Sequence, residues 1–172
     1  MGASFFYIAF GVCFICFMTR TSYYILANRG SRLAESRKFI NMLFVIMFFL
    51  WLSWFFMSFN DPYKMNLPSW LRYTGLALFI IGFGLFLFSH RTIKGQESDK
   101  LVTRGLYSKI RHPMYLGFII WIIGLPVFFN SPITLASAII WIPQILYWRA
   151  SEERHLEGKY KDYQEYKKKT WF

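Results

Sequence analysis

Apolar residues gather in five segments that short polar stretches separate. These segments are residues 3–18, 39–59, 70–89, 113–129 and 133–148. A helix needs about 20 residues to cross a hydrocarbon core of about 30 Å, so the pattern predicts about five transmembrane helices. Only Asn130, Ser131 and Pro132 join the last two segments, which we therefore expect to form a helical hairpin. The expected fold class is all-α, in a polytopic membrane protein.

A different pattern follows the fifth apolar segment. Leu156, Tyr160, Tyr163 and Tyr166 recur at helical spacing beside a face of Lys and Glu. Such a stripe is typical of an amphipathic helix. Two arrangements are open: the fifth helix extends into the cytoplasm, or a separate C-terminal helix folds back over the neighbouring polar segments.

No internal repeat or long polar linker divides the chain. We therefore expect residues 1–172 to form a single membrane domain. Residues 1–89 would be a three-helix scaffold, and residues 90–172, which alternate polar segments with the hairpin, would carry the function.

Composition and charge support a membrane protein. The 172 residues are 55% hydrophobic and 22% aromatic, which is too apolar for an ordinary soluble domain. The net charge is +11, and basic residues follow the first, third and fifth segments, whereas the connections 60–69 and 130–132 hold only Lys64. The positive-inside tendency then places the N-terminus outside and the C-terminus in the cytoplasm. This distribution favours anionic lipid head groups over nucleic acid as partners.

Other features of the first three segments have structural explanations. Gly75, Gly82 and Gly84 are expected to let neighbouring helices approach closely. Cys13 and Cys16 lie one turn apart within the first segment, where buried cysteines act as small apolar side chains. No second ligand pair follows them, and the three histidines lack a metal-ligand spacing, so no metal is expected.

Ionisable and turn-forming residues cluster at residues 104–117, at the start of the fourth apolar segment. Pro113 suits the first turn of a helix and biases His112 toward an extended backbone. Exposed amides and the positive end of the helix dipole can hold a carboxylate there. Tyr107 and Tyr115 offer flat surfaces and hydroxyls to an adenine or a ribose. The alternative is that these residues only anchor the helix at the interface.

Two adjacent carboxylates follow the fifth segment. Because the hairpin is short, Glu152 and Glu153 return to the same membrane face as His112. One of them is expected to form an intrahelical pair with Arg149, worth about 0.3 to 0.5 kcal/mol. The other is then free to hold a cation, an amine or a hydroxyl donor.

Together these motifs resemble a known family. The resemblance rests on Leu101-Val102-Thr103, Gly105, Tyr107, Arg111-His112-Pro113, Tyr115 and Gly117, followed after the hairpin by Glu152-Glu153 and Leu156. The set is similar to the C-terminal signature of isoprenylcysteine carboxyl methyltransferases and their phospholipid methyltransferase relatives, over about residues 99–167. The resemblance implies an integral membrane methyltransferase that uses S-adenosylmethionine, with an isoprenylcysteine-type carboxylate or a related lipid as acceptor.

The resemblance also implies roles for individual residues. The cofactor-binding positions would be Lys100, Leu101, Val102, Tyr107, His112, Pro113, Met114, Tyr115 and Glu152. Arg149 would orient the substrate. Like the family, the chain lacks the glycine-rich loop of soluble methyltransferases, since Gly82 and Gly84 lie in mid-span.

The chain departs from the family pattern in two places. Residues 90–96 replace a Gly-x-x-Trp-Ser-like element, which leaves the acceptor open. Tyr160-Lys161 stands where relatives tend to carry an aromatic-Gly pair, so the lid over the cofactor is expected to differ.

Methyl transfer from a sulfonium mainly requires the reactants to be aligned and water to be excluded. A carboxylate acceptor needs no base and Arg149 could orient it by a bidentate contact, whereas an amine or thiol needs a base that the sequence does not identify. Two other functions stay open: an NADPH-dependent membrane sterol-type reductase, which shares the C-terminal architecture, and a non-enzymatic scaffold that binds anionic lipid.

Overall fold

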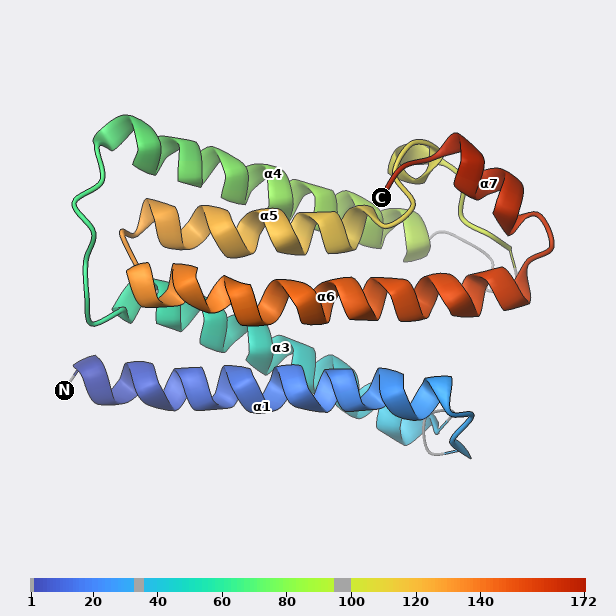
Figure 1. The fold of residues 1–172 in the computed structure, drawn as a ribbon, viewed down its shortest axis with the longest axis horizontal. Helices are drawn as coiled ribbons and strands as arrows, with labels where there is room; N and C mark the ends of the chain where they lie inside the picture. Colours follow the sequence, from blue (N-terminus) through green and yellow to red (C-terminus); the bar gives the residue numbers. More distant parts are fainter. Residues whose placement is uncertain (1, 33–35, 95–99) are drawn as a thin grey trace.

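The structure is a computed structural model that describes residues 2–32, 36–94 and 100–172. Within these ranges it consists of helices without a strand, which confirms the all-α class. The helices are α1 (Gly2–Asn28), α3 (Arg37–Asn60), α4 (Ser69–Lys94), the 3-10 helix η1 (Gly105–Ser108), α5 (Pro113–Phe128), α6 (Pro132–Lys159) and α7 (Tyr163–Lys169). The five long helices run along one axis, and η1 and α7 lie together at one end (Figure 1).

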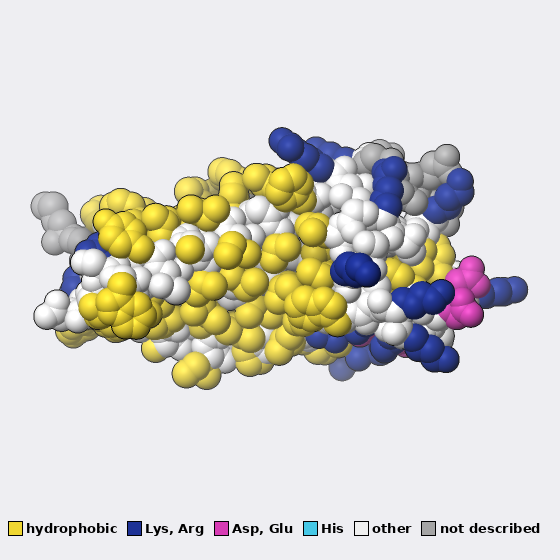
Figure 2. Space-filling view, turned by 90° about the horizontal axis from the view of Figure 1, so that it is seen from above, with side chains coloured by type: hydrophobic (Ala, Val, Ile, Leu, Met, Phe, Trp, Pro, Cys, Tyr) yellow, Lys and Arg dark blue, Asp and Glu magenta, His cyan; other side chains and the backbone are white. Residues whose placement is uncertain are grey.

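Three of the described helices are long and apolar enough to cross a membrane: Ser4–Asn28, Lys38–Asn60 and Ser69–Lys94. Helix α5 is apolar but has only 16 residues, and α6 carries charged residues in its second half. The expected count of five spans therefore stays a prediction. Apolar side chains cover the body of the molecule, and Lys and Arg gather at one end (Figure 2). This distribution is typical of a protein embedded in a bilayer.

Two helices extend beyond the apolar segments that predicted them. Helix α1 continues past residue 18 because no Gly or Pro interrupts it before Gly30, whose φ of +69° closes the helix. Helix α6 continues to Lys159, and α7 is a separate helix after it. Both arrangements left open by the sequence therefore occur together.

The predicted hairpin joins α5 and α6. Asn130 turns the chain with a positive φ of 58°, and Pro132 occupies the first turn of α6. Asp61, at the end of α3, accepts hydrogen bonds from the backbone N–H (2.8 Å) and the hydroxyl (2.9 Å) of Thr134. The start of α6 is thus tied to α3, and the far end of α6 is directed to the basic end of the molecule.

Pairs of glycines bring α4 and α5 into backbone contact. A Cβ added to Gly82 would lie 2.6 Å from the carbonyl oxygen of Gly117, and one added to Gly75 would lie 2.7 Å from that of Gly124. The close approach expected of Gly75 and Gly82 is confirmed. The same expectation is wrong for Gly84: it lies on another face of the helix, where an added Cβ would meet no atom of the described residues within 4 Å.

We expect Gly82→Ala to destabilise the protein by about 1 to 3 kcal/mol. The added methyl group would overlap backbone atoms of α5, which cannot move without shifting the helix. Gly84→Ala is the matched control on the same helix and should not lower stability. Equilibrium unfolding in mixed micelles of increasing dodecyl sulfate content measures both. Equal stability of the two variants would contradict the close packing.

Aromatic side chains fasten α1 to α6. Phe17 stacks on Trp141 with ring centroids 4.5 Å apart and on Trp148 at 5.2 Å. The Trp148 indole N–H donates to the Thr21 hydroxyl at 2.9 Å. The polar end of α1 is therefore held against the half of α6 that carries the two glutamates.

Candidate active site

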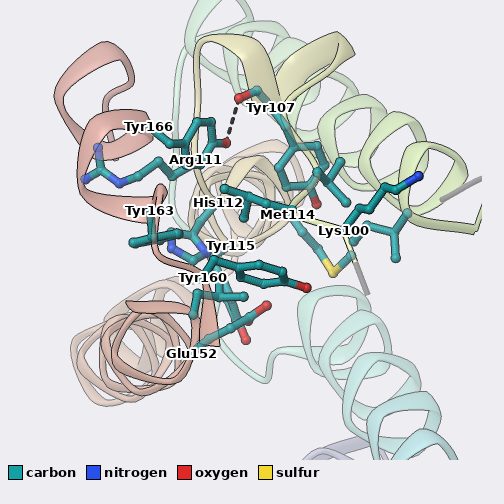
Figure 3. Close-up of a pocket in the computed structure, with 14 residues that line it drawn as sticks. Lys100, Tyr107, Arg111, His112, Met114, Tyr115, Glu152, Tyr160, Tyr163 and Tyr166 are labelled. Carbon is teal, nitrogen blue, oxygen red and sulfur yellow. Dashed lines mark hydrogen bonds between the residues drawn. The ribbon is translucent and has the colours of Figure 1, made fainter. Parts of the chain in front are cut away.

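A cavity of about 240 Å³ lies at the basic end, between the η1 segment, the start of α5, the end of α6 and α7 (Figure 3). Its walls are mostly aromatic and aliphatic, with a few polar groups. It is lined by Ile93, Lys100, Leu101, Val102, Tyr107, Arg111, His112, Met114, Tyr115, Glu152, Leu156, Tyr160, Tyr163 and Tyr166. An apolar pocket with few convergent polar groups is typical of a small-molecule site.

A second cavity of about 620 Å³ adjoins the first on the side of α7. The two share Lys100, Leu101, Tyr160 and Tyr166 as lining residues. A ligand larger than the first cavity therefore has room to extend between the 100–108 segment and α7.

The start of α5 places His112 in the cavity wall. Pro113 is the first residue of the helix, and His112 is its N-cap with φ −127° and ψ 59°. The His112 side chain is only 4% exposed, and its Nε2 atom has no hydrogen-bond partner in the described part of the chain. Burial lowers the pKa of His112 from 6.5 to about 4, despite the opposing charge of Glu153. The imidazole is therefore neutral at physiological pH.

This pKa predicts a pH-dependent stability. Because the folded-state pKa lies below the unfolded value of 6.5, the unfolded chain takes up the proton first as the pH falls. From pH 7 to pH 5 the contribution of His112 to stability should fall by about 2 kcal/mol. His112→Asn should remove this part of the dependence and the exposed His155→Asn should not, as measured by unfolding at each pH. A wild-type dependence retained in His112→Asn would contradict the assignment.

The two adjacent glutamates face different surroundings. Glu152 is half-buried and lines the cavity, where Figure 3 shows it below Tyr115. Burial raises the pKa of Glu152, while the Tyr115 hydroxyl and the Arg20 guanidinium oppose that rise. Glu152 is therefore a carboxylate that can gain free energy from a bound donor or cation.

Glu153 instead joins helices together. It is 8% exposed and accepts a hydrogen bond from Arg111 Nε at 2.9 Å. Arg149 Nη2 lies 3.6 Å from Glu153 Oε2, and Lys167 Nζ lies 3.7 Å from Glu153 Oε1. Burial raises the pKa of Glu153, but these cations outweigh it and lower the pKa overall. The expected intrahelical pair with Arg149 is present, within a network that also reaches the η1 segment and α7.

Helix α7 and the residues after it cover the cavity. The Tyr166 hydroxyl donates to the Tyr107 carbonyl at 2.6 Å, and burial raises the pKa of Tyr166 to about 12, so it stays a donor. Arg111 Nη1 donates to the carbonyls of Lys167 and Thr170. Trp171 forms an isolated parallel bridge with Ile110. The amphipathic C-terminal segment thus folds back over the site.

Most residues predicted from the sequence are brought together. Lys100, Leu101, Val102, Tyr107, His112, Met114, Tyr115 and Glu152 line the cavity. Pro113 is buried at the helix start and does not line it. Arg149 does not line it either; its guanidinium lies between Glu153 and the Phe172 ring, 4.7 Å from the ring centroid.

Sequence reasoning missed other lining residues. Leu156, Tyr160, Tyr163 and Tyr166 belong to the amphipathic stripe, which predicted a covering helix but not its contact with a ligand site. The contribution of α1 was missed as well: Tyr24 and Tyr115 share a hydrogen bond of 2.7 Å between their hydroxyls. No signal along the chain links positions so far apart.

The described residues contain no group of three or more His, Cys, Asp or Glu side chains that could hold a metal ion. The polar groups of the cavity are instead a carboxylate, a neutral imidazole, tyrosine hydroxyls and cations, which suit an organic ligand.

Comparison with known proteins places the site within a family. Residues 70–163 match the model of the phospholipid methyltransferase family. The chain is similar to protein-S-isoprenylcysteine O-methyltransferase B of Arabidopsis thaliana, 37% identical over 95 residues, which cover 49% of this chain and 46% of the relative. It is 32% identical over 117 residues to the human protein-S-isoprenylcysteine O-methyltransferase, covering 59% and 40%. For the enzyme of that name in Saccharomyces cerevisiae the identity is 39% over 90 residues, covering 48% and 36%.

The chain spans less than half the length of each of these three relatives. No solved structure matches it. The matched part contains the η1 segment, α5 and the glutamates of α6, and therefore most of the cavity.

Proposed function

Since the chain belongs to the phospholipid methyltransferase family, we propose that it is a membrane methyltransferase that uses S-adenosylmethionine to methylate a lipophilic acceptor. The observation that carries this proposal is the cavity, whose wall contains eight of the nine cofactor positions that the family resemblance implies. The matches do not support the reductase or the non-enzymatic scaffold.

The residues present fit this cofactor. His112 Nε2 and the Tyr163 hydroxyl are buried in the lining without a hydrogen-bond partner among the described residues. Buried polar atoms are nearly always hydrogen-bonded, so both are available to a ligand. Glu152 supplies an anionic acceptor, and the tyrosines supply flat apolar surfaces. A nucleoside that carries an amino acid offers groups of all these kinds.

We assign the following roles. Glu152 accepts hydrogen bonds from the cofactor's amine or hydroxyl groups, the His112 segment holds its carboxylate, and Tyr107 or Tyr115 contacts its adenosine. Lys100, Leu101, Val102 and Met114 complete the wall, with Pro113 fixing the start of α5. The cofactor supplies an electrophilic methyl group, and α7 keeps water from it.

For the acceptor we propose an isoprenylcysteine-type carboxylate, the substrate named for the relatives, with a related lipid as the alternative. Such a carboxylate needs alignment and no base. Arg149 is our candidate for orienting it, since its buried Nε has no partner within the described ranges. The apolar part of the acceptor would enter sideways between the helices, from the bilayer.

We also propose the orientation and division of the chain. The N-terminus would lie outside and the basic end with the cavity in the cytoplasm, as the distribution of Lys and Arg favours (Figure 2). The cofactor would then enter from the cytosol. Residues 90–172 would carry the cofactor site, on a scaffold formed by residues 1–89.

The test is calorimetric binding of S-adenosylhomocysteine to the purified protein in detergent, with a nicotinamide dinucleotide as control. We expect saturable binding of the first ligand only. Methyl transfer to an isoprenylcysteine and to a phospholipid would then be compared in bilayers. Binding of the dinucleotide alone would replace the proposal with a reductase, and binding of neither would refute a cofactor site.

A further inference from the structure

The Arg20 cation of α1 lies beside the candidate site, and no carboxylate of the described residues pairs with it. Arg20 Nη2 donates to the Tyr24 hydroxyl at 3.1 Å, and its guanidinium carbon lies 5.0 Å from the centroid of the Tyr24 ring. In the described part of the chain no carboxylate lies within 4.0 Å of Arg20, and its buried Nε has no partner. A guanidinium so close to hydrocarbon is costly unless another charge compensates it.

The compensating charge lies across a pair of tyrosines. Tyr24 hydrogen-bonds to Tyr115 of α5, hydroxyl to hydroxyl, at 2.7 Å. Tyr115 lines the cavity next to Glu152 of α6 (Figure 3). The pair thus links Arg20 of α1 to the cavity wall beside Glu152.

We propose that Arg20 is a positioning residue of the site, which acts through the Tyr24–Tyr115 hydroxyl pair to stabilise the Glu152 carboxylate and to orient it toward the cavity. That this orientation serves cofactor binding rests on the proposed function. Helix α1, which precedes the 70–163 match, would then belong to the working site rather than only to the scaffold.

The groups that surround Glu152 show why one cation matters. Tyr24 of α1, Tyr115 of α5 and Tyr107 of η1 face it as neutral hydroxyls. Positive charge comes from Arg20 and from the exposed His155 on α6 itself. Since His155 is open to solvent, which screens its charge, Arg20 is the main cation that opposes protonation of the Glu152 carboxyl.

The experiment follows the Glu152 carboxyl by infrared difference titration, with Glu152→Gln identifying its band. We expect Arg20→Gln to raise the titration midpoint by about one pH unit or more, and Arg20→Lys to restore most of it. Tyr24→Phe should give an intermediate shift. The control Arg29→Gln removes the same charge from an exposed site beyond the end of α1 and should leave the midpoint unchanged.

Binding of S-adenosylhomocysteine gives a second readout. In Arg20→Gln it should weaken about tenfold at pH 7 and recover at a pH above the midpoint that the infrared titration gives for this variant. A loss that is equal at both pH values, or a midpoint equal to that of Arg29→Gln, would refute the positioning role. Absence of binding in the wild type would refute the proposed function instead, since the infrared titration needs no ligand.

Discussion

Glu152→Gln is expected to raise the dissociation constant of S-adenosylhomocysteine at least about 100-fold at pH 7.5. The amide keeps the shape of the side chain but removes the charge and replaces one acceptor with a donor. Hydrogen bonds to a charged group contribute about 1.5 to 3 kcal/mol, and a misplaced donor in a half-buried wall adds a desolvation cost. Calorimetry on the purified variant measures the change, with wild-type melting behaviour as evidence of folding.

The matched control for this variant is Glu157→Gln. Glu157 lies on the same helix and pairs with Lys167 at 2.8 Å, but it lines neither cavity. Its loss should change affinity by no more than about threefold, as expected for a partly exposed ion pair. If both variants bind equally well, Glu152 does not contact the cofactor.

The pH dependence of binding offers a separate check. Burial raises the pKa of Glu152, so the carboxylate is lost at a higher pH than an exposed glutamate would be. Affinity should therefore weaken as the pH falls through this raised pKa. Glu152→Gln should bind weakly and without this dependence.

The sequence predicted the elements because each depends on local pattern. The five apolar segments, the short turn before Pro132 and the stripe of tyrosines correspond to α1, α3, α4, the α5–α6 hairpin and α7. Helix ends were less predictable. Polar residues follow residue 18, yet α1 continues because packing of Tyr24 and hydrogen bonding by Thr21 occur beyond the apolar run.

The division of roles between the two glutamates needed the structure. The sequence predicted that one would pair with Arg149 and the other bind a ligand, but not which. Successive residues on a helix point about 100° apart, so the rotation of α6 relative to α5 decides which glutamate faces the cavity. That rotation directs Glu152 into the cavity and Glu153 toward Arg111.

The contribution of α1 could not be predicted for a similar reason. Arg20 and Tyr24 lie in a segment whose basic residues are explained as flanks of a membrane helix. Tyr115, the partner of Tyr24, is 91 residues away in the sequence. The packing of α1 on α6, through Phe17 and Trp148, brings them to the site.

Glu153→Ala is expected to destabilise the protein by about 3 to 5 kcal/mol, because it leaves buried positive charge without compensation. The Arg111 and Glu153 side chains are each only 10% exposed, and Arg149 would lose its carboxylate as well. Arg111 also holds the carbonyls of Lys167 and Thr170, so the loss should release the cover over the cavity. Unfolding in mixed micelles and the rate of tryptic cleavage at residues 167–169 measure the two effects.

Glu165→Gln is the control that distinguishes the loss of the buried Glu153 network from the loss of an exposed ion pair. Glu165 pairs with Lys169 on α7 at 3.9 Å, but the two side chains are 78% and 75% exposed. Its loss should leave both the melting temperature and the cleavage rate unchanged, since exposed pairs contribute little. Because the pKa of Glu153 lies below the ordinary value, wild-type stability from this network should persist at neutral pH and decline as acid protonates the carboxyl. A Glu153→Ala protein as stable and as resistant to trypsin as Glu165→Gln would show that α7 is held by its backbone and tyrosine contacts alone.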